Sequence, residues 1–289
     1  MMEDSSNGKS RRNVLKTASL TSLGLAVPVG TVGASSKGKE NSAVEVVTAK
    51  SSMSIGPDSS GLSKKEHDAY IERMSEKYGS DAVQNASLMS SSDSSGDGAD
   101  QEPDRAENLT YKNSKTAHLE AEDNDGTVIV ESDNKIAFYE SDTEDEEGRR
   151  HYFYWHWTAG QSREQGSWKG NLWNMWNRAR EQDGNDMLEY SPVEDQTENG
   201  NEYTISLSAE YKGVGVSIKG DYVLDQDKVR PHPDYTAVGN NGEFAVQWIG
   251  DYEGSQGFVG SCETRRPDGN SRSLDWDAYL KGGKYAKTH

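Results

Sequence analysis

The sequence contains a single cysteine, Cys262, in 289 residues. One thiol cannot form a disulfide within the chain, so the sequence excludes a small secreted fold held together by disulfides. Proline and phenylalanine are also scarce, with 7 and 4 residues. Because phenylalanine is rare, tryptophan and tyrosine must supply much of the buried aromatic area.

Long hydrophobic runs are missing too. Beyond the N-terminal segment, no stretch approaches the roughly 18 apolar residues of a membrane-spanning helix, so we expect no stable membrane anchor. Positive charge is in deficit, because 31 Lys and Arg face 49 Asp and Glu, for a net charge of −18. This excess repels nucleic acid and anionic lipid surfaces, and we expect neither as a partner.

Signatures of common enzymes are also absent from the sequence. It has no Gly-x-Ser-x-Gly elbow, no His-Glu-x-x-His helix and no glycine-rich phosphate loop ending in Lys-Ser/Thr. Cys262 paired with His151, His156 or His232 would give a thiol and an imidazole, but the surrounding residues match no protease signature. The sequence therefore assigns no catalytic residue, and a half-buried structural cysteine is the favoured interpretation.

The N-terminus carries two adjacent arginines, Arg11 and Arg12, in the sequence SRRNVLK, followed by a weakly apolar run that ends at Ala34. A charged head, an apolar middle and small residues form a cleavable signal. The segment resembles the twin-arginine (Tat) export signal, with Val14 where that consensus has phenylalanine. The resemblance implies that residues 1–34 are removed and that the Tat translocase exports the folded chain. The product would be secreted or associated with the cell surface.

Four basic and two acidic residues lie in 1–34, which leaves 27 basic and 47 acidic residues and a net charge of −20. An acidic, Gly- and Ser-rich exported chain is similar to proteins of salt-loving archaea, in which dense salt screens the repulsion between carboxylates. An ordinary acidic exported protein of a bacterium is the alternative.

Residues 35–104 are predicted to be a flexible segment with one short helix, at about 63–78. Ser63 and Glu66 form a capping box, and Gly79 ends the helix. A Ser- and Asp-rich linker follows, as either a solvated spacer or part of a removable pro-segment. Two sequons, at Asn85 and Asn108, lie in or beside this linker.

Residues 110–289 are predicted to form a β-rich domain. Asp125-Gly126 marks a hairpin turn, 132–135 indicates another turn, and apolar spacing at 172, 175, 176 and 179 indicates a helix. We expect a mainly β fold, an antiparallel sandwich or open barrel built from meander hairpins. One helix packs on it, and the N-terminal region is largely disordered.

The densest chemical feature is the sequence HYFYWHW at 151–157. On a strand, Tyr152, Tyr154 and His156 share one face, and Trp173 follows nearby in sequence. These four residues are the candidate ligand-binding side chains, as an aromatic platform for a sugar or another flat ligand. The alternative is that the strand is buried on both faces and serves only as core.

Acidic turns at 123–125, 142–147 and 183–186 offer oxygen ligands suited to calcium. None matches the full EF-hand loop, so we expect no cofactor, with calcium left as an unsupported alternative and no metal ligand assigned. The leading hypothesis is a non-enzymatic secreted or cell-surface binding protein with an unknown extracellular ligand. A halocin-like antimicrobial precursor and a secreted hydrolase are the alternatives.

Overall fold

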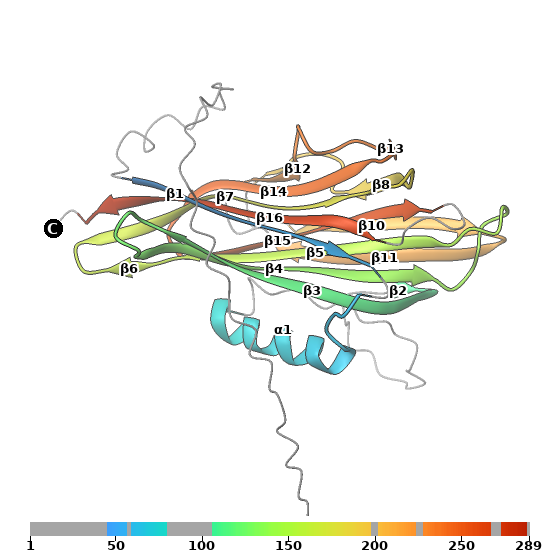
Figure 1. Ribbon diagram of the computed structural model, residues 1–289, viewed down its shortest axis with the longest axis horizontal. Helices are drawn as coiled ribbons and strands as arrows, with labels where there is room; N and C mark the ends of the chain where they lie inside the picture. The colour runs from blue at the N-terminus through green and yellow to red at the C-terminus, as the bar shows by residue number, and fades with distance from the viewer. Residues whose placement is uncertain are drawn as a thin grey trace, which may run out of the picture. The chain divides into compact units, whose positions relative to one another are not determined.

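A computed structural model describes residues 45–56, 59–79, 106–197, 202–223, 228–266 and 273–287 (Figure 1). The signal residues Arg11, Arg12 and Ala34 and the sequon at Asn85 lie outside the described residues. No helix in these ranges is long and apolar enough to cross a membrane.

Three antiparallel sheets and one helix, α1 (Lys64–Tyr78), make up the described chain. Sheet A runs in the order β1 (Glu45–Ile55), β16 (Leu274–Ala286), β7 (Trp168–Arg180), β14 (Glu243–Tyr252), β12 (Lys228–Pro231) and β9 (Gln196–Thr197), with β6 (Glu164–Gln165) also on β7. Sheet B runs β13 (Gly239–Asn240), β8 (Asp186–Ser191), β15 (Ser255–Arg265), β5 (His151–Ser162), β4 (Val128–Ser141) and β3 (Leu109–Glu122). Sheet C consists of β10 (Glu202–Tyr211), β11 (Val214–Val223) and β2 (Ala106–Glu107).

Sheet B is the middle layer of this arrangement. On one face, His156 of β5 hydrogen-bonds Asn177 of β7 in sheet A. On the other face, Trp157 of β5 meets Tyr70 of α1 edge-on, and Tyr203 of sheet C hydrogen-bonds the backbone of β15. Sheets A and B approach so closely that a Cβ atom on Gly260 would lie 2.8 Å from Val246. The predicted mainly β antiparallel sandwich is confirmed, and the one helix that packs on it among the described residues is α1.

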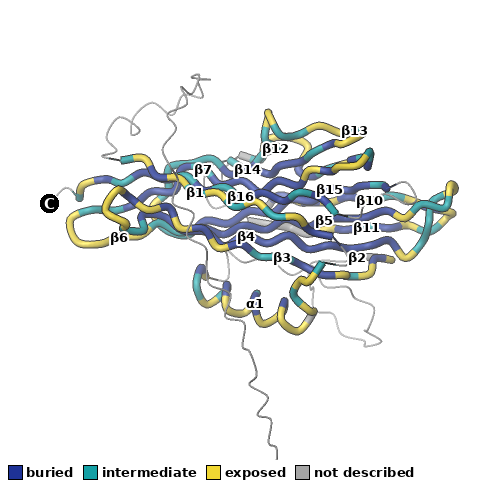
Figure 2. The backbone as a smooth tube through the Cα atoms, viewed as in Figure 1, coloured by how far each residue is buried: buried dark blue, intermediate teal, exposed yellow. Residues whose placement is uncertain are grey.

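Being the middle layer explains why β4 and β5 are dark along almost their whole length in Figure 2. Residues 151–160 are all buried, and so are residues 129–141. The turn predicted at 132–135 is wrong, because β4 runs straight through it. Its polar side chains find partners in α1: Asp133 accepts hydrogen bonds from Lys77 and Tyr78.

The helix predicted around 172–179 is also wrong, since these residues form β7, paired with β16 on one side and β14 on the other. The register shifts between Lys281 and Gly282, which leaves Trp173 as the extra residue of a β-bulge. Because of the bulge, the inward-facing Leu172 and Met175 lie three positions apart, a separation that resembles a helical period. The apolar spacing in the sequence therefore reflects a bulged strand and not a helix.

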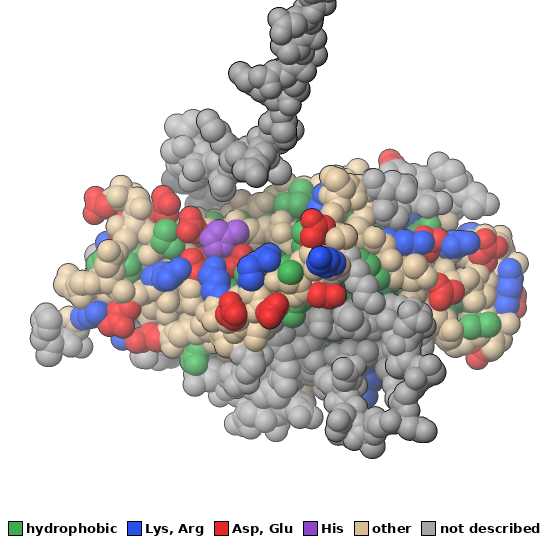
Figure 3. Space-filling view, turned by 90° about the horizontal axis from the view of Figure 1, so that it is seen from below, with side chains coloured by type: hydrophobic (Ala, Val, Ile, Leu, Met, Phe, Trp, Pro, Cys, Tyr) green, Lys and Arg blue, Asp and Glu red, His purple; other side chains and the backbone are tan. Residues whose placement is uncertain are grey.

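Residues 45–79, which the sequence placed in a flexible segment, contribute two elements to the fold. Strand β1 pairs with β16 along all 11 of its residues. The predicted capping box at Ser63 and Glu66 is confirmed, and Tyr70 of α1 is buried against sheet B. The surface seen from the helix side carries Lys and Arg beside Asp and Glu (Figure 3).

Strand β1 forms one edge of sheet A, and α1 packs on one face of sheet B. Removal of residues 35–104 would therefore uncover that edge and that face.

Candidate functional site

The aromatic strand that the sequence proposed as a ligand platform is closed on both faces. Tyr152 is 4% exposed, and Tyr154 and His156 are fully buried. The guanidinium of Arg266 lies 4.8 Å from the ring centre of Tyr152 and forms a 3.0 Å ion pair with Glu181. The structure thus corrects the expectation of an open platform, because the two tyrosines enclose a buried ion pair.

His156 lies between Cys262 and Asn177, side chains whose combination some cysteine hydrolases use. Its Nε2 atom is 3.6 Å from Cys262 Sγ, and its Nδ1 atom is 2.8 Å from Asn177 Oδ1. Burial raises the pKa of the Cys262 thiol well above its usual value and lowers the pKa of His156 to about 4. Both groups are therefore neutral and closed to solvent, which describes a structural cysteine and not a nucleophile.

We predict that Cys262 does not react with a thiol-specific disulfide reagent in the native protein and reacts fully in denaturant. The reason is the complete burial of the side chain and the raised pKa of its thiol. The measurement is the absorbance of the released thiolate, followed over time with and without guanidinium chloride. Rapid stoichiometric reaction of the native protein would contradict this assignment.

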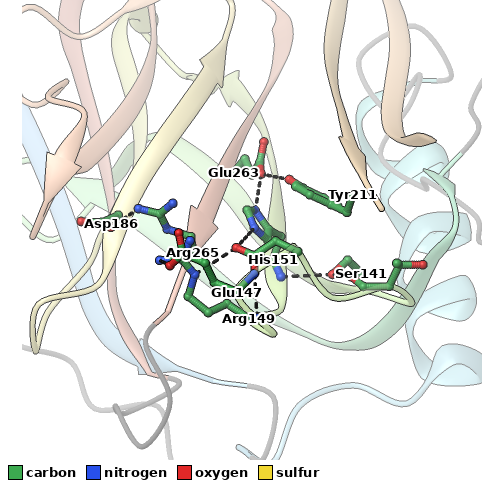
Figure 4. Close-up of polar contacts among 10 residues, drawn as sticks. Ser141, Glu147, Arg149, His151, Asp186, Tyr211, Glu263 and Arg265 are labelled. Atoms are coloured by element: carbon green, nitrogen blue, oxygen red, sulfur yellow. Dashed lines mark hydrogen bonds and ion pairs between the residues drawn. The ribbon is translucent and has the colours of Figure 1, made fainter. Parts of the chain in front are cut away.

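A second polar cluster joins β5, β15 and β10 at one end of sheet B (Figure 4). His151 Nδ1 is 2.7 Å from Glu263 Oε1, and His151 Nε2 is 3.3 Å from Asp145 Oδ2. The Tyr211 ring packs against the imidazole with centroids 4.0 Å apart and planes tilted by 33°, and its hydroxyl donates to Glu263. Because carboxylates occupy both ring nitrogens, His151 has none left for a substrate proton or a metal. The cluster fastens sheet C to sheet B.

A cleft of about 250 Å³ lies beside this cluster, between the acidic turn at 145–149 and the β10–β11 turn. Asp145 lines the cleft. Burial by itself would raise the pKa of this carboxyl, but hydrogen bonds from Arg149 and His151 outweigh it and lower the pKa to about 2. The lining residues are Asp145, Glu146, Glu147, Arg149, Glu210, Tyr211, Lys212 and Gly213. The cleft is polar and has no aromatic surface besides Tyr211.

Two of the three acidic turns use a carboxylate to stabilise their own backbones. Asp123 accepts hydrogen bonds from two amides of its turn, one of them that of Thr127 at 2.8 Å, and it also pairs with Lys284. Asp145 accepts from the amide of Arg149 in the same way. These interactions give Asp123 and Asp145 a structural role in their turns.

One group of possible metal ligands occurs among the described residues. His118, Glu120 and Glu131 each offer an atom within 4.8 Å of the others. Glu131, however, already pairs with Lys77 at 3.1 Å and with Arg163 at 2.7 Å. A cation at this position would compete with two positive side chains.

The outer face of sheet A, turned away from sheet B, carries a different kind of surface. Its strands align one transverse row of side chains, which are Arg230, Gln247, Trp176, Tyr279 and Lys50 on β12, β14, β7, β16 and β1. Trp176 and Tyr279 stack with centroids 5.2 Å apart and planes 13° from parallel.

The loop after β12 covers part of this row with two more rings. Tyr235 packs 5.5 Å from Trp176, and His232 stacks on Tyr235 at 4.4 Å. Nothing in the sequence placed His232 here, because a histidine between two prolines is typical of an exposed loop. Burial lowers the pKa of His232 to about 4, so its ring is neutral at pH 7. We call Trp176, Tyr279, Tyr235 and His232 the aromatic cluster.

Buried polar atoms without partners surround the aromatic cluster. Gln247 is 4% exposed, and its Oε1 atom has no hydrogen-bond partner among the described residues. Within the same part of the chain, Arg230 Nε and Thr236 Oγ1 are also buried without partners. Such atoms are uncommon in folded proteins, and each calls for an explanation such as a bound water or ligand.

Of the four candidate residues named from the sequence, only Trp173 lies on this face. It is 6% exposed, its indole N–H donates to the Tyr285 hydroxyl at 3.1 Å, and Lys281 Nζ lies 5.4 Å from its ring centre. The aromatic cluster was missed because its members come from β7, the loop after β12 and β16, which are far apart in sequence.

No protein-family model matches this chain, and no curated protein matches it.

Proposed function

We propose that this chain is an exported, non-enzymatic binding protein that holds a saccharide or another flat ligand on the outer face of sheet A. The observation that carries the proposal is the aromatic cluster bordered by unpartnered polar atoms. Flat rings supply apolar contact, and a few well-placed polar groups fix orientation, which is the usual composition of a ligand site. The N-terminal resemblance to a Tat signal supports export.

Two side chains already occupy the ring faces that a cationic ligand would need. Arg178 lies 4.5 Å from the ring centre of Tyr235, and Lys50 lies 5.6 Å from that of Trp176. Because the protein provides its own cation–π partners, the face favours neutral or anionic ligands.

The test is a glycan array probed with labelled protein from culture supernatant. The intact mass of this protein should equal that of a chain that starts at Ser35. Tyr235→Ala and Tyr279→Ala should each weaken binding by about tenfold, since an aromatic contact contributes on the order of 1 kcal/mol. Tyr190→Ala, at a half-buried tyrosine on β8, is the matched control and should leave binding unchanged. Binding that ignores both cluster variants, or no binding to any saccharide, would overturn the proposal.

A further inference from the structure

The outer face of sheet A carries more basic than acidic side chains, although the chain as a whole is acidic. Seven outward-facing strand residues are basic and five are acidic, whereas the whole chain has a net charge of −18. The basic residues are Lys50, Lys169, Arg178, Arg180, Lys228, Arg230 and Lys281, and the acidic residues are Glu164, Glu243, Asp251, Asp275 and Asp277. An acidic protein that gathers cations on one face has a surface suited to an anionic partner.

Two of these cations lack a close carboxylate among the described residues. Across the part of the chain that the structure describes, no ion pair is formed by Arg230 or Lys281. Lys50 is 3.9 Å from Asp277, and its side chain is 50% exposed. In a chain with an excess of carboxylates, cations left unpaired beside an aromatic cluster are available to a ligand.

The chemistry of the outer face indicates which anions fit. Its cations donate hydrogen bonds and need acceptors, whereas the hydroxyls of the half-buried Tyr235 and Tyr279 can both donate and accept. A sugar acid offers both, hydroxyl donors and carboxylate acceptors on one ring. A DNA phosphate backbone offers acceptors only, because it has no hydroxyl group along its length.

Resting on the proposed function, we infer that the ligand is an acidic polysaccharide, with sugar rings on the aromatic cluster and sugar carboxylates on Arg230, Lys281 and Lys50. Arginine binds a carboxylate through two parallel hydrogen bonds, which favours it over lysine as the main anchor. Arg230 is therefore the residue whose loss should weaken binding most among the three cations.

The experiment compares polygalacturonate oligomers with the same oligomers after full methyl esterification, which removes the charge and keeps the sugar. Titration calorimetry with the full chain measures both affinities. Esterification should weaken binding by at least about tenfold, the effect of losing charge-assisted hydrogen bonds. Raising the salt from about 0.1 M to about 1 M should weaken binding of the acid form, because a shorter Debye length screens exposed ion pairs.

Variants locate the charge contacts on the protein. Arg230→Gln should reduce affinity for the acid form by about tenfold and leave affinity for the ester nearly unchanged. Lys281→Gln should have a smaller effect in the same direction. Lys65→Gln makes the same chemical change at an exposed position of α1, on the other side of sheet B, and should have no effect.

The outcomes separate this inference from the proposed function. Equal affinity for acid and ester, with loss in Tyr279→Ala, would overturn the acidic class and keep a saccharide site. A single-stranded oligodeoxynucleotide that binds as tightly and responds to Arg230→Gln would overturn it in favour of a general polyanion surface. If neither oligomer binds, the acidic class is also overturned, while a neutral hit on the glycan array would still support the proposed function.

Discussion

Replacing Asn177 with alanine should lower the melting temperature by on the order of 10 °C, from a loss of about 3–4 kcal/mol in the free energy of unfolding. Asn177 is fully buried between sheets A and B. Its Oδ1 atom accepts hydrogen bonds from His156 Nδ1 and from the indole N–H of Trp276. Its Nδ2 atom donates to the carbonyl oxygen of Lys135 at 3.2 Å.

The size of this loss follows from what alanine leaves behind. Two buried donors, on His156 and Trp276, would lose their shared acceptor, and each unsatisfied group costs about 1–3 kcal/mol. A small cavity adds to the loss.

The measurement is thermal unfolding followed by circular dichroism. Asn174→Ala is the matched control, because Asn174 lies three residues earlier on β7 and faces outward, and it should change stability by about 0.5 kcal/mol or less. A melting temperature of Asn177→Ala within about 2 °C of the wild-type value would show that this asparagine does not link the sheets.

Replacing Lys135 with methionine should stabilise the protein by about 2 kcal/mol near neutral pH. The reason is that a buried amine, which must lose its proton on folding, is replaced by an apolar side chain of similar length. Lys135 is fully buried on β4, where its amine contacts His67 of α1. Burial lowers the pKa of this amine well below the usual lysine value, with a smaller opposing effect from Asp68.

The pH dependence follows from the direction of this shift. In the unfolded chain Lys135 binds a proton below about pH 10.4, whereas in the folded chain it stays neutral down to its lowered pKa. The unfolded state therefore binds more protons between these two values, and the wild-type protein loses stability as the pH falls through that window. Below the lowered pKa both states are protonated, and the difference becomes constant.

Denaturant unfolding at about pH 6, 8 and 10 measures the effect. The gain in Lys135→Met should shrink as the pH rises, because the penalty it removes is absent when the unfolded lysine is also neutral. Lys115→Met, at a half-buried lysine on β3, serves as the control. Parallel stability curves for wild type and Lys135→Met across this range would show that Lys135 is not held neutral.

Local signals in the sequence predicted the local structure well. Ser63 and Glu66 form the predicted capping box, and Gly126 takes the positive φ of 77° that a tight hairpin turn requires. These features depend on neighbours within a few residues, so the sequence alone is sufficient to identify them.

The errors came where partners lie far away in sequence. Asp133 and Lys135 are typical of a turn, and they became part of a buried strand because Lys77, Tyr78 and His67 of α1 meet them there. No spacing rule within β4 could have indicated those contacts. The period at 172–179 misled for a related reason, since only pairing with β16 reveals the bulge at Trp173.

The sequence by itself determined the β-rich class, the capped helix and the shortage of cations and cysteine, because these depend on composition and on short-range geometry. Tertiary structure decided which aromatic residues lie between the sheets and which lie on the outer face of sheet A. Stacking of sheets A and B buried Tyr154 and His156, while register across four strands brought Trp176, Tyr279, Gln247 and Arg230 into one row. A face of a sheet is formed by strands distant in sequence, so its chemistry exists only once the chain has folded.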